Sequence, residues 1–231
     1  FSLFLSENNL ILSQNQLNQL DQYFHLLIEK NKVMNLTGIT EEGEVYEKHF
    51  FDSLLFTFSA FFKKEEASLI DVGSGAGFPG LVIAICYPKL NVTLLEPLGK
   101  RCNFLNEVIT ALKLTNVNVV NMRSEDYALA NREKYDFCVS RAVAKLNILL
   151  ELMMPLIKVG GIFIALKGDK GDEELLEAAN ALKKLSGTVI EKQEVTLPTN
   201  HDKRINIFVK KEKATANIYP RLYAKIKKKP L

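Results

Sequence analysis

Three closely spaced glycines follow an acidic residue in the segment LIDVGSGAGFPGLVIAI, residues 69–85. The acid is Asp71, and the glycines are Gly73, Gly75 and Gly77. Glycine adopts backbone conformations that other residues avoid, so such a run lets the chain turn sharply off a strand and approach a ligand closely. No Gly-Lys-Ser or Gly-Lys-Thr follows, which excludes a P-loop for nucleoside triphosphates. The turn therefore predicts a site for a ligand that contains adenosine.

A second acidic residue, Glu96, ends the next apolar strand, about 20 residues further along the chain. An acid in this place holds the two ribose hydroxyls in nucleotide-binding folds. Pro79 suits the first turn of the intervening helix, where its missing N–H costs nothing. A tight turn without a ligand would explain the glycines alone, but it would not explain the agreement of strand, glycines, helix and acid.

Both NAD and S-adenosylmethionine contain the predicted adenosine. Asp71 favours S-adenosylmethionine, because a carboxylate before the first glycine suits the ammonium of a methionine moiety better than a pyrophosphate. The segment SED, residues 124–126, follows the third predicted strand, where a polar side chain can meet the adenine amino group. The Tyr-x-x-x-Lys pattern of nicotinamide enzymes occurs only at Tyr223 and Lys227, away from any strand end, so we discount it.

Apolar strands alternate with helical segments after the first third of the chain. The predicted strands are SLIDV, NVTLLE, VNVVN, YDFCVS, GIFIAL, TVIEKQEVTL and RINIFVK. Such alternation predicts the α/β class, with a mostly parallel, Rossmann-like sheet covered by helices on both faces. The last two strands leave too little chain between them for a crossover helix, so we expect the final strand of this mixed seven-stranded sheet to be antiparallel.

The residues before the first strand predict a helical extension. Ser13 and Gln16 form a capping-box pattern in front of an apolar stripe of helical spacing. A second helix is predicted from Glu41 to Phe62, with Thr40 as its N-cap. The charged segment KKEEA, residues 63–67, then separates the extension from the first strand.

We expect three parts that together form one compact unit. Residues 1–66 are the helical extension, 67–213 the cofactor-binding catalytic domain and 214–231 a basic C-terminal tail. With 47% hydrophobic and 25% charged residues, the composition is that of a soluble globular protein, and the net charge of +3 imposes no overall field.

Targeting and redox features predict a cytoplasmic protein. The longest uncharged apolar runs are too short to cross a bilayer, and the start of the chain lacks a secretory signal pattern. The cysteines Cys86, Cys102 and Cys138 lie in apolar contexts without metal or CxxC spacing, so we interpret them as buried, reduced thiols.

Several motifs in order along nearly the whole chain resemble the bacterial 16S rRNA guanine-N7 methyltransferase family, also known as glucose-inhibited division protein B. They are NKVMNLTGIT, KHFFDSL, LIDVGSGAGFPGLVIAI, LLEPLGKRCNFL, SRAVAKL, ALKG and the final KKPL. The resemblance implies a class I S-adenosylmethionine-dependent methyltransferase fold. It also implies a target, N7 of guanosine 527 of 16S rRNA in the standard rRNA numbering.

The resemblance also assigns residues to roles. It implies cofactor contacts at Gly73, Phe78, Ser124, Glu125 and Arg141, with Glu96 at the ribose; Asp71, Gly75 and Gly77 complete the predicted set. Lys167 and Arg204 match basic positions on the RNA side, and Arg141 and Lys167 are the residues expected to act in catalysis. The tail sequence departs from the family pattern, so the family's contacts in this region correspond poorly to particular residues of this chain.

The end of the fourth predicted strand carries Ser140 and Arg141 in place of a catalytic base or nucleophile. Methylation of an amino group or of cytosine C5 would need Asn/Asp-Pro-Pro-aromatic or Pro-Cys there, and Cys138 lacks the proline. Lys145, a candidate base for ribose methylation, has no acidic partner in the local sequence. Guanine N7 has an in-plane lone pair and no proton, so its methylation needs positioning and no deprotonation.

The tail combines basic and aromatic residues. Arg221, Lys227 and Lys228 are the predicted RNA contacts there, and Tyr219 and Tyr223 could stack on exposed bases. A solvated, disordered end is the competing interpretation. Because the A-form major groove hides N7, the target is expected to be a loop or a splayed-out base.

His49, Asp52 and Ser53 lie within about one helical turn and resemble a catalytic triad, but a hydrogen-bonded helix packed on the catalytic domain is the better interpretation. The histidines have no companion ligands at useful spacing, so no metal site is predicted. We expect a monomer whose partner is 16S rRNA or the small ribosomal subunit. A small-molecule methyltransferase and a non-catalytic S-adenosylmethionine- and RNA-binding protein remain as alternatives, with an NAD dehydrogenase more distant.

Overall fold

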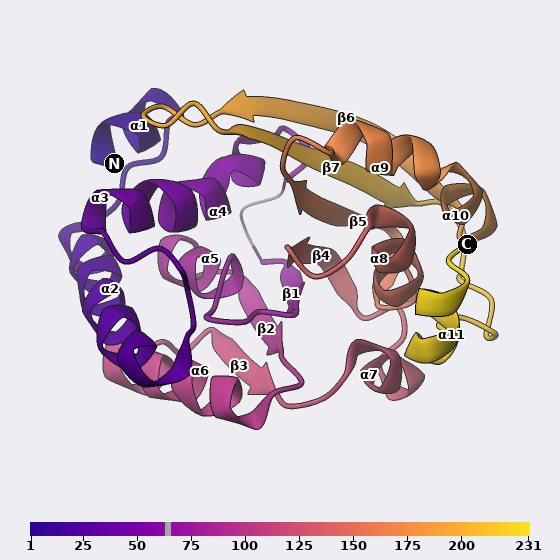
Figure 1. Cartoon of the computed structure of the whole chain (residues 1–231), viewed down its shortest axis with the longest axis horizontal. Helices are drawn as coiled ribbons and strands as arrows, with labels where there is room; N and C mark the ends of the chain where they lie inside the picture. The colour runs from indigo at the N-terminus through magenta and orange to yellow at the C-terminus, as the bar shows by residue number, and fades with distance from the viewer. Residues whose placement is uncertain (63–65) are drawn as a thin grey trace.

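A twisted central sheet flanked by helices organises the computed structural model, which describes residues 1–62 and 66–231 (Figure 1). In this described part the sheet has seven strands in the order β3-β2-β1-β4-β5-β7-β6. The strands are β1 (Ser68–Val72), β2 (Asn91–Leu95), β3 (Val117–Val120), β4 (Tyr135–Arg141), β5 (Ile157–Lys167), β6 (Gly187–Thr196) and β7 (Lys203–Lys211). The pairs among β1 to β5 are parallel, and β7 runs antiparallel to both β5 and β6. The predicted fold class is confirmed.

Helices cover both faces of this sheet (Figure 1). They are α1 (Ser2–Glu7), α2 (Gln14–Met34), α3 (Glu42–Val45), the π-helical turn η1 (Tyr46–Phe51), α4 (Asp52–Leu54), the 3₁₀ turn η2 (Leu55–Phe58), α5 (Gly80–Cys86), α6 (Gly99–Leu112), α7 (Ser124–Ala130), α8 (Leu146–Met153), α9 (Gly171–Glu177), α10 (Ala179–Lys184) and α11 (Tyr223–Lys228). None of the helices in the described ranges is long and apolar enough to span a membrane.

Successive strand residues point to opposite faces and so build two separate cores. On β1, Leu69 belongs to the core under α5 and α6, whereas Ile70 belongs to the core under α7 to α10. On β4, Val139 and Cys138 divide in the same way. The cysteines of the chain are buried and unpaired, as predicted.

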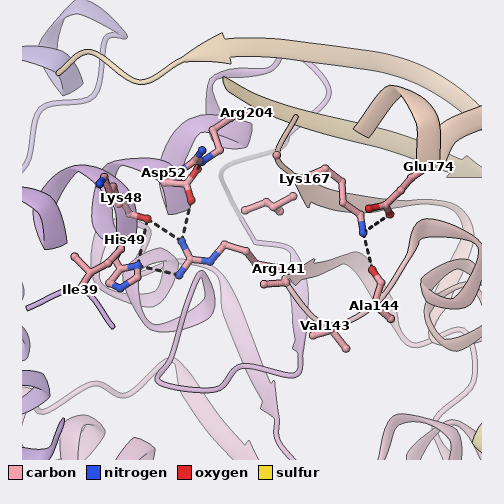
Figure 2. A pocket seen from close by; sticks show the side chains of 13 residues that line it. Ile39, Lys48, His49, Asp52, Arg141, Val143, Ala144, Lys167, Glu174 and Arg204 are labelled. Carbon is pink, nitrogen blue, oxygen red and sulfur yellow. Dashed lines mark hydrogen bonds and ion pairs between the residues drawn. The ribbon is translucent and has the colours of Figure 1, made fainter. Parts of the chain in front are cut away.

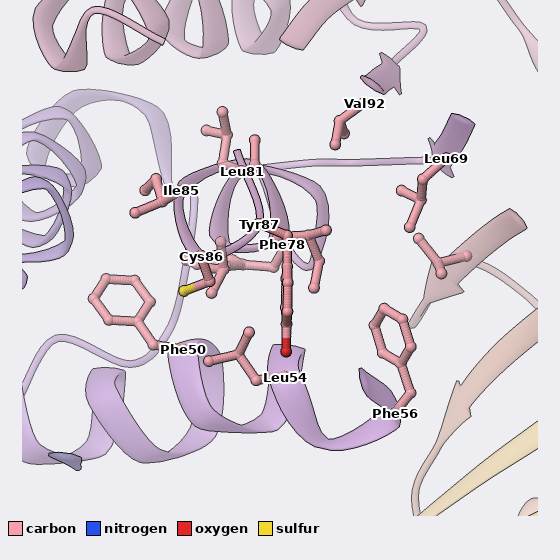
Figure 3. Close-up of a cluster of buried hydrophobic side chains, with 14 of the residues drawn as sticks. Phe50, Leu54, Phe56, Leu69, Phe78, Leu81, Ile85, Cys86, Tyr87 and Val92 are labelled. Atoms are coloured by element: carbon pink, nitrogen blue, oxygen red, sulfur yellow. The ribbon is translucent and has the colours of Figure 1, made fainter. Parts of the chain in front are cut away.

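The helical extension is anchored on α5. The predicted capping box of α2 is present, with the Ser13 side chain and the Gln16 backbone paired, and the Gln16 amide also donates to the carbonyls of Ile85 and Cys86 at 2.9 and 3.0 Å. Behind it, aromatic and aliphatic side chains of η1 and α4 pack on α5, as Phe50 and Leu54 show in Figure 3. The extension and the sheet therefore share one core.

The second predicted helix differs from the expectation in two ways. Its N-cap is Glu41, whose carboxylate accepts from the backbone N–H of Glu44 at 2.9 Å, and not Thr40. The segment is also a succession of α, π and 3₁₀ turns that ends at Phe58, and not one regular helix to Phe62. The irregular turns place His49 in η1 and Asp52 at the start of α4, and both contact Arg141 at the end of β4. Tertiary contacts therefore override the regular helical pattern here. Residues 63–65 of the predicted separator lie outside the described residues.

The C-terminal tail is docked on the domain, contrary to a disordered end. Arg132 donates to the carbonyls of Thr215 and Tyr219 at 2.6 and 2.7 Å. Arg221 forms two hydrogen bonds with the fully buried carboxylate of Glu151, at 2.7 and 2.6 Å. The tail then ends in α11, which packs against α8 (Figure 1).

Loss of the Arg221 side chain should destabilise the fold, because it leaves the Glu151 carboxylate buried without its cation. We expect Arg221→Ala to lower the free energy of unfolding by about 3 kcal/mol, and a joint Arg221→Leu/Glu151→Leu replacement to cost clearly less. The exposed pair Lys145–Glu177 provides the control, since Lys145→Ala should cost below about 1 kcal/mol. Urea denaturation measures all three, and equal small losses for Arg221→Ala and Lys145→Ala would contradict the burial argument.

Candidate active site

The carboxyl ends of the parallel strands surround a cavity of about 500 Å³, which we call the glycine cavity. Gly73, Gly75, Phe78, Glu96 and Arg141 are among its lining residues. In open parallel sheets, ligands bind at this edge, where crossovers leave the sheet in opposite directions. The sheet order places that switch between β1 and β4.

The glycine turn uses backbone conformations that require glycine. Gly73, Gly75 and Gly77 have φ angles of +75°, +59° and +104°. A Cβ on Gly73 would lie 2.5 Å from Val143 Cγ2, and one on Gly77 would lie 2.6 Å from the Tyr23 hydroxyl. That hydroxyl donates to the Ala76 carbonyl at 2.5 Å, so helix α2 supports the turn from behind. Gly77 is not on the cavity wall; its role in this structure is the turn itself.

Glu96 stands where the ribose acid was predicted. It lines the glycine cavity, and its carboxylate accepts from the backbone N–H groups of Gly75 and Leu98 at 2.9 and 3.0 Å. Arg101 Nη1 approaches to 4.0 Å. These contacts fix the direction of the carboxylate, which is the preorganisation that a ribose-binding acid needs.

Asp71 lies beneath the turn and is fully buried. Its Oδ2 accepts from the N–H of Gly80 at 2.9 Å, while Oδ1 has no hydrogen-bond partner among the residues that the structure describes. Burial raises the pKa of Asp71 to about 7. Because Asp71 is not among the residues that line the glycine cavity, the structure gives it a supporting role, and its predicted contact with the cofactor stays a prediction.

A smaller cavity of about 180 Å³, the tyrosine cavity, adjoins the glycine cavity, since Gly73, Pro97 and Val143 line both. Ser124 and Glu125 lie on its wall, as the prediction of an adenine site at this strand end requires. The wall also includes Tyr223 of the tail, which the sequence analysis considered for stacking on exposed RNA bases and not for this cavity.

Arg141 closes β4 and lines a further cavity of about 550 Å³, the arginine cavity, as well as the glycine cavity. Its guanidinium carbon lies 5.1 Å from the centroid of the Phe78 ring, and His49 stacks on the same ring at 4.5 Å. Burial, together with the nearby Arg141 charge, lowers the pKa of His49 to about 3, so the imidazole is neutral at physiological pH.

Asp52 is the functional residue whose role the sequence reasoning missed. Its carboxylate accepts from Arg141 Nη1 at 2.9 Å and from Arg204 Nε at 3.0 Å (Figure 2). The Ser53 hydroxyl instead donates to the His49 carbonyl, so no triad exists and the packed-helix interpretation is confirmed. The i, i+3 spacing of His49 and Asp52 was the signal that the sequence offered for this site. It suggested a contact between these two residues, whereas the partners of Asp52 are Arg141 and Arg204, far along the chain.

Lys167 and Arg204 both line the arginine cavity, and contact of either residue with RNA stays a prediction (Figure 2). The Lys167 ammonium contacts Glu174 at 2.7 Å and donates to the Ala144 carbonyl at 2.6 Å. The cavity therefore presents cations that are already paired with carboxylates.

The predicted RNA contacts of the tail lie apart from this cluster. Arg221 is engaged with Glu151, whereas Lys227 and Lys228 are exposed on α11. Lys211, another basic residue near the tail, is fully buried and pairs with Glu133, so it is not free for phosphate. RNA binding by these residues stays a prediction.

Among the described residues, no cysteine lines the glycine, tyrosine or arginine cavity. Cys138 is fully buried in the core. Lys145 does have an acidic partner, Glu177, contrary to the sequence expectation, but the pair is exposed and outside the glycine and arginine cavities. Within residues 1–62 and 66–231, no three His, Cys, Asp or Glu side chains are grouped to hold a metal ion. The two cavities that Arg141 lines can hold one ligand each, close to one another.

Comparison with known proteins identifies close relatives. A family described as rRNA small subunit methyltransferase G, GidB, matches residues 16–205. The ribosomal RNA small subunit methyltransferase G of Lactobacillus acidophilus is 47% identical over 100% of this chain and 98% of its own length. The protein of that name from Halalkalibacterium halodurans is 44% identical over 98% of this chain and 96% of its own.

Solved structures show the same fold at low identity. A SAM dependent methyltransferase from Aquifex aeolicus has a TM-score of 0.55 and 20% identity, covering 72% of this chain and 93% of that chain. M. jannaschii TYW2, solved in complex with AdoMet, has a TM-score of 0.57 and 16% identity, covering 75% and 79%.

Replacement of Gly73 should damage the ligand site. In Gly73→Ala the positive φ and the 2.5 Å approach to Val143 both oppose the new methyl group, which must displace Val143 on the cavity wall. We expect at least an approximately tenfold loss of affinity for S-adenosylhomocysteine, measured by calorimetry. Gly38→Ala, where an added Cβ meets nothing within 4 Å, is the matched control. Equal affinities of the two variants would contradict the steric argument.

The buried Asp71 should make stability depend on pH. Its pKa of about 7 in the folded protein exceeds the ordinary value of 3.8, so the folded state binds the proton more tightly. The resulting stabilisation is complete below about pH 4 and is lost as the pH rises through 7, at up to about 1.4 kcal/mol per pH unit. Asp71→Asn should lack this slope.

Urea denaturation across that pH range measures the effect as the difference between the wild type and Asp71→Asn. The difference is needed because His49, with its lowered pKa, contributes a slope of opposite sign that is common to both proteins. Parallel stability curves for the two proteins would show that Asp71 does not titrate in this window.

Proposed function

The chain belongs to the rRNA small subunit methyltransferase G family, and on that premise we propose that it methylates N7 of a single guanosine, guanosine 527, in 16S rRNA. The coarser activity, S-adenosylmethionine-dependent methylation of 16S rRNA, comes with the family. The observation that supports the finer proposal is the junction at Arg141, which lines both the glycine cavity and the arginine cavity. A cofactor in the glycine cavity and a guanine base in the arginine cavity would meet beside Arg141.

The residues of the glycine and tyrosine cavities fit S-adenosylmethionine. The positive φ of Gly73 and Gly75 opens the backbone toward the ligand, and Glu96 offers a fixed carboxylate for ribose hydroxyls. The tyrosine cavity has mostly apolar walls with Ser124 and Glu125 at one side, which suits an adenine ring. When bound, this cofactor supplies an electrophilic methyl group on a sulfonium. The buried Asp71 keeps the turn that receives it in shape.

Guanine N7 has no proton to lose, so the proposed reaction needs no proton acceptor from the arginine cavity. The carboxylates that line the cavity, Asp52 and Glu174, are engaged with cations. His49 is neutral but is turned to Thr37, whose hydroxyl lies 2.7 Å from its Nε2. Because N7 carries a free lone pair, the task of the protein is to hold the base in line with the methyl group. In this proposal Arg204 and Lys167, which line the cavity, contact O6 or phosphate, and such contacts must leave N7 itself open.

The RNA must present a guanine that is free of its helix, since a side chain cannot read N7 in the deep A-form groove. We propose that a loop of 16S rRNA inserts the splayed-out base into the arginine cavity. The exposed Lys227 and Lys228 on α11 would then meet flanking phosphates of the small subunit. A protein monomer is sufficient for this arrangement.

The direct test is methyl transfer from labelled S-adenosylmethionine to small ribosomal subunits from cells that lack the activity, followed by chemical mapping of N7-methylguanine. We expect one modified guanosine, at position 527. Arg141→Ala should lower the transfer rate by at least about a hundredfold, because it removes a charged side chain that lines both cavities. Cofactor binding without label in any RNA would overturn the proposal in favour of a sensor or a small-molecule enzyme.

Lys145→Ala is the control for this experiment. Lys145 lies four residues after Arg141 but is exposed and paired with Glu177, so its loss should leave the rate within about twofold of the wild type. A large effect of Lys145→Ala, with label found on a ribose, would instead point to a hydroxyl acceptor and a lysine base.

A further inference from the structure

The tail contributes a side chain to the cofactor site. Tyr223, at the start of α11, is the one aromatic residue among the described residues that line the tyrosine cavity. We propose that its ring contacts the adenine of the bound cofactor, so that the C-terminal segment is part of the cofactor site. This inference rests on the proposed function, because it takes S-adenosylmethionine as the occupant of the cavity.

The shape and chemistry of the cavity support an aromatic base as the occupant. At about 180 Å³, it is much smaller than the glycine cavity, to which Gly73 and Val143 join it. Leu95 and Leu152 add apolar wall, and Ser124 supplies a polar edge. A flat base between aliphatic residues and an aromatic ring buries apolar surface on both sides, while its amino group can reach the polar edge.

The tail holds Tyr223 in place through contacts on both sides. Before it, Arg221 is tied to the buried Glu151 carboxylate by two hydrogen bonds, and its backbone N–H donates to the same carboxylate at 3.0 Å. After it, Ile226 is fully buried in the core beneath α8. Because the residues around it are fixed in this way, Tyr223 meets a ligand without a large loss of side-chain freedom.

Tyr223 differs from its tail neighbours in ways that provide controls. Leu222, the preceding residue, is 66% exposed and does not line the cavity. Tyr219 packs on the same core from the tail but is also absent from the cavity wall. A tyrosine that served only to dock the tail would therefore resemble Tyr219, whereas the cavity position distinguishes Tyr223.

The test is calorimetric binding of S-adenosylhomocysteine to the full chain. We expect Tyr223→Ala to weaken binding about tenfold, within the range for an aromatic side chain against a base, and Tyr223→Phe to stay within about twofold of the wild type. Leu222→Ala should bind as the wild type does. Adenosine alone should show the same loss in Tyr223→Ala, because the contact lies at the base end of the ligand.

The outcomes separate the inference from the proposed function. Wild-type protein that binds no S-adenosylhomocysteine overturns both. Binding that Tyr223→Ala leaves unchanged overturns the inference and leaves the proposed function standing. Equal losses in Tyr223→Ala and Leu222→Ala would show loosening of the tail in place of a contact, and would also overturn the inference.

A second measurement tests whether the Arg221–Glu151 pair positions the Tyr223 ring. The joint Arg221→Leu/Glu151→Leu replacement removes the anchor without leaving a buried charge, and it should lower affinity for S-adenosylhomocysteine by up to the loss seen in Tyr223→Ala. Adding Tyr223→Ala to this background should then cost less than it does in the wild type. If the losses of affinity add strictly, the Arg221–Glu151 pair and the Tyr223 ring act independently. That result would overturn the idea that the pair positions the ring.

Discussion

The carboxylate of Asp52 joins three parts of the chain that are distant in sequence. It lies at the start of α4 in the extension, and it pairs with Arg141 at the end of β4 and with Arg204 on β7. Only 5% of Asp52 is exposed, so its two partners are needed to offset the cost of removing its charge from water. The pairing fixes where Arg141 points, and Arg141 in turn lines both the glycine cavity and the arginine cavity.

The same constraint explains why the extension belongs to the catalytic unit. The π turn η1 brings His49 onto the Phe78 ring while Asp52 reaches the strand ends. One helix earlier, Tyr23 supports the glycine turn through the Ala76 carbonyl. Tyr23 and His49, which both precede the first strand, therefore contact the glycine turn at Ala76 and Phe78. The sheet alone would not complete the site.

The local patterns of the sequence were sufficient for the strands, the glycine turn, the capping box at Ser13 and the antiparallel final pair. Each depends on residues that lie near one another in the chain. The roles of Asp52, Glu151 and Tyr223 were not predictable in this way, since their partners are separated from them by long stretches of chain. Lys211 shows the same limit: it lies in a run of basic residues that ends the last strand, but its ammonium is buried and donates to the Met154 and Ile157 carbonyls.

Under the proposed function, the charges of the arginine cavity would tolerate a cationic product. Methylation at N7 leaves a positive charge on guanine, and unpaired cations around the base would oppose it. Arg141 and Arg204 share Asp52, Lys167 is paired with Glu174, and His49 is neutral because its pKa is low. Donors for O6 or phosphate are thus available without a large excess of positive charge. A base or nucleophile would add nothing to this reaction, whereas a fixed, nearly compensated set of donors lets geometry determine which atom of the guanine receives the methyl group.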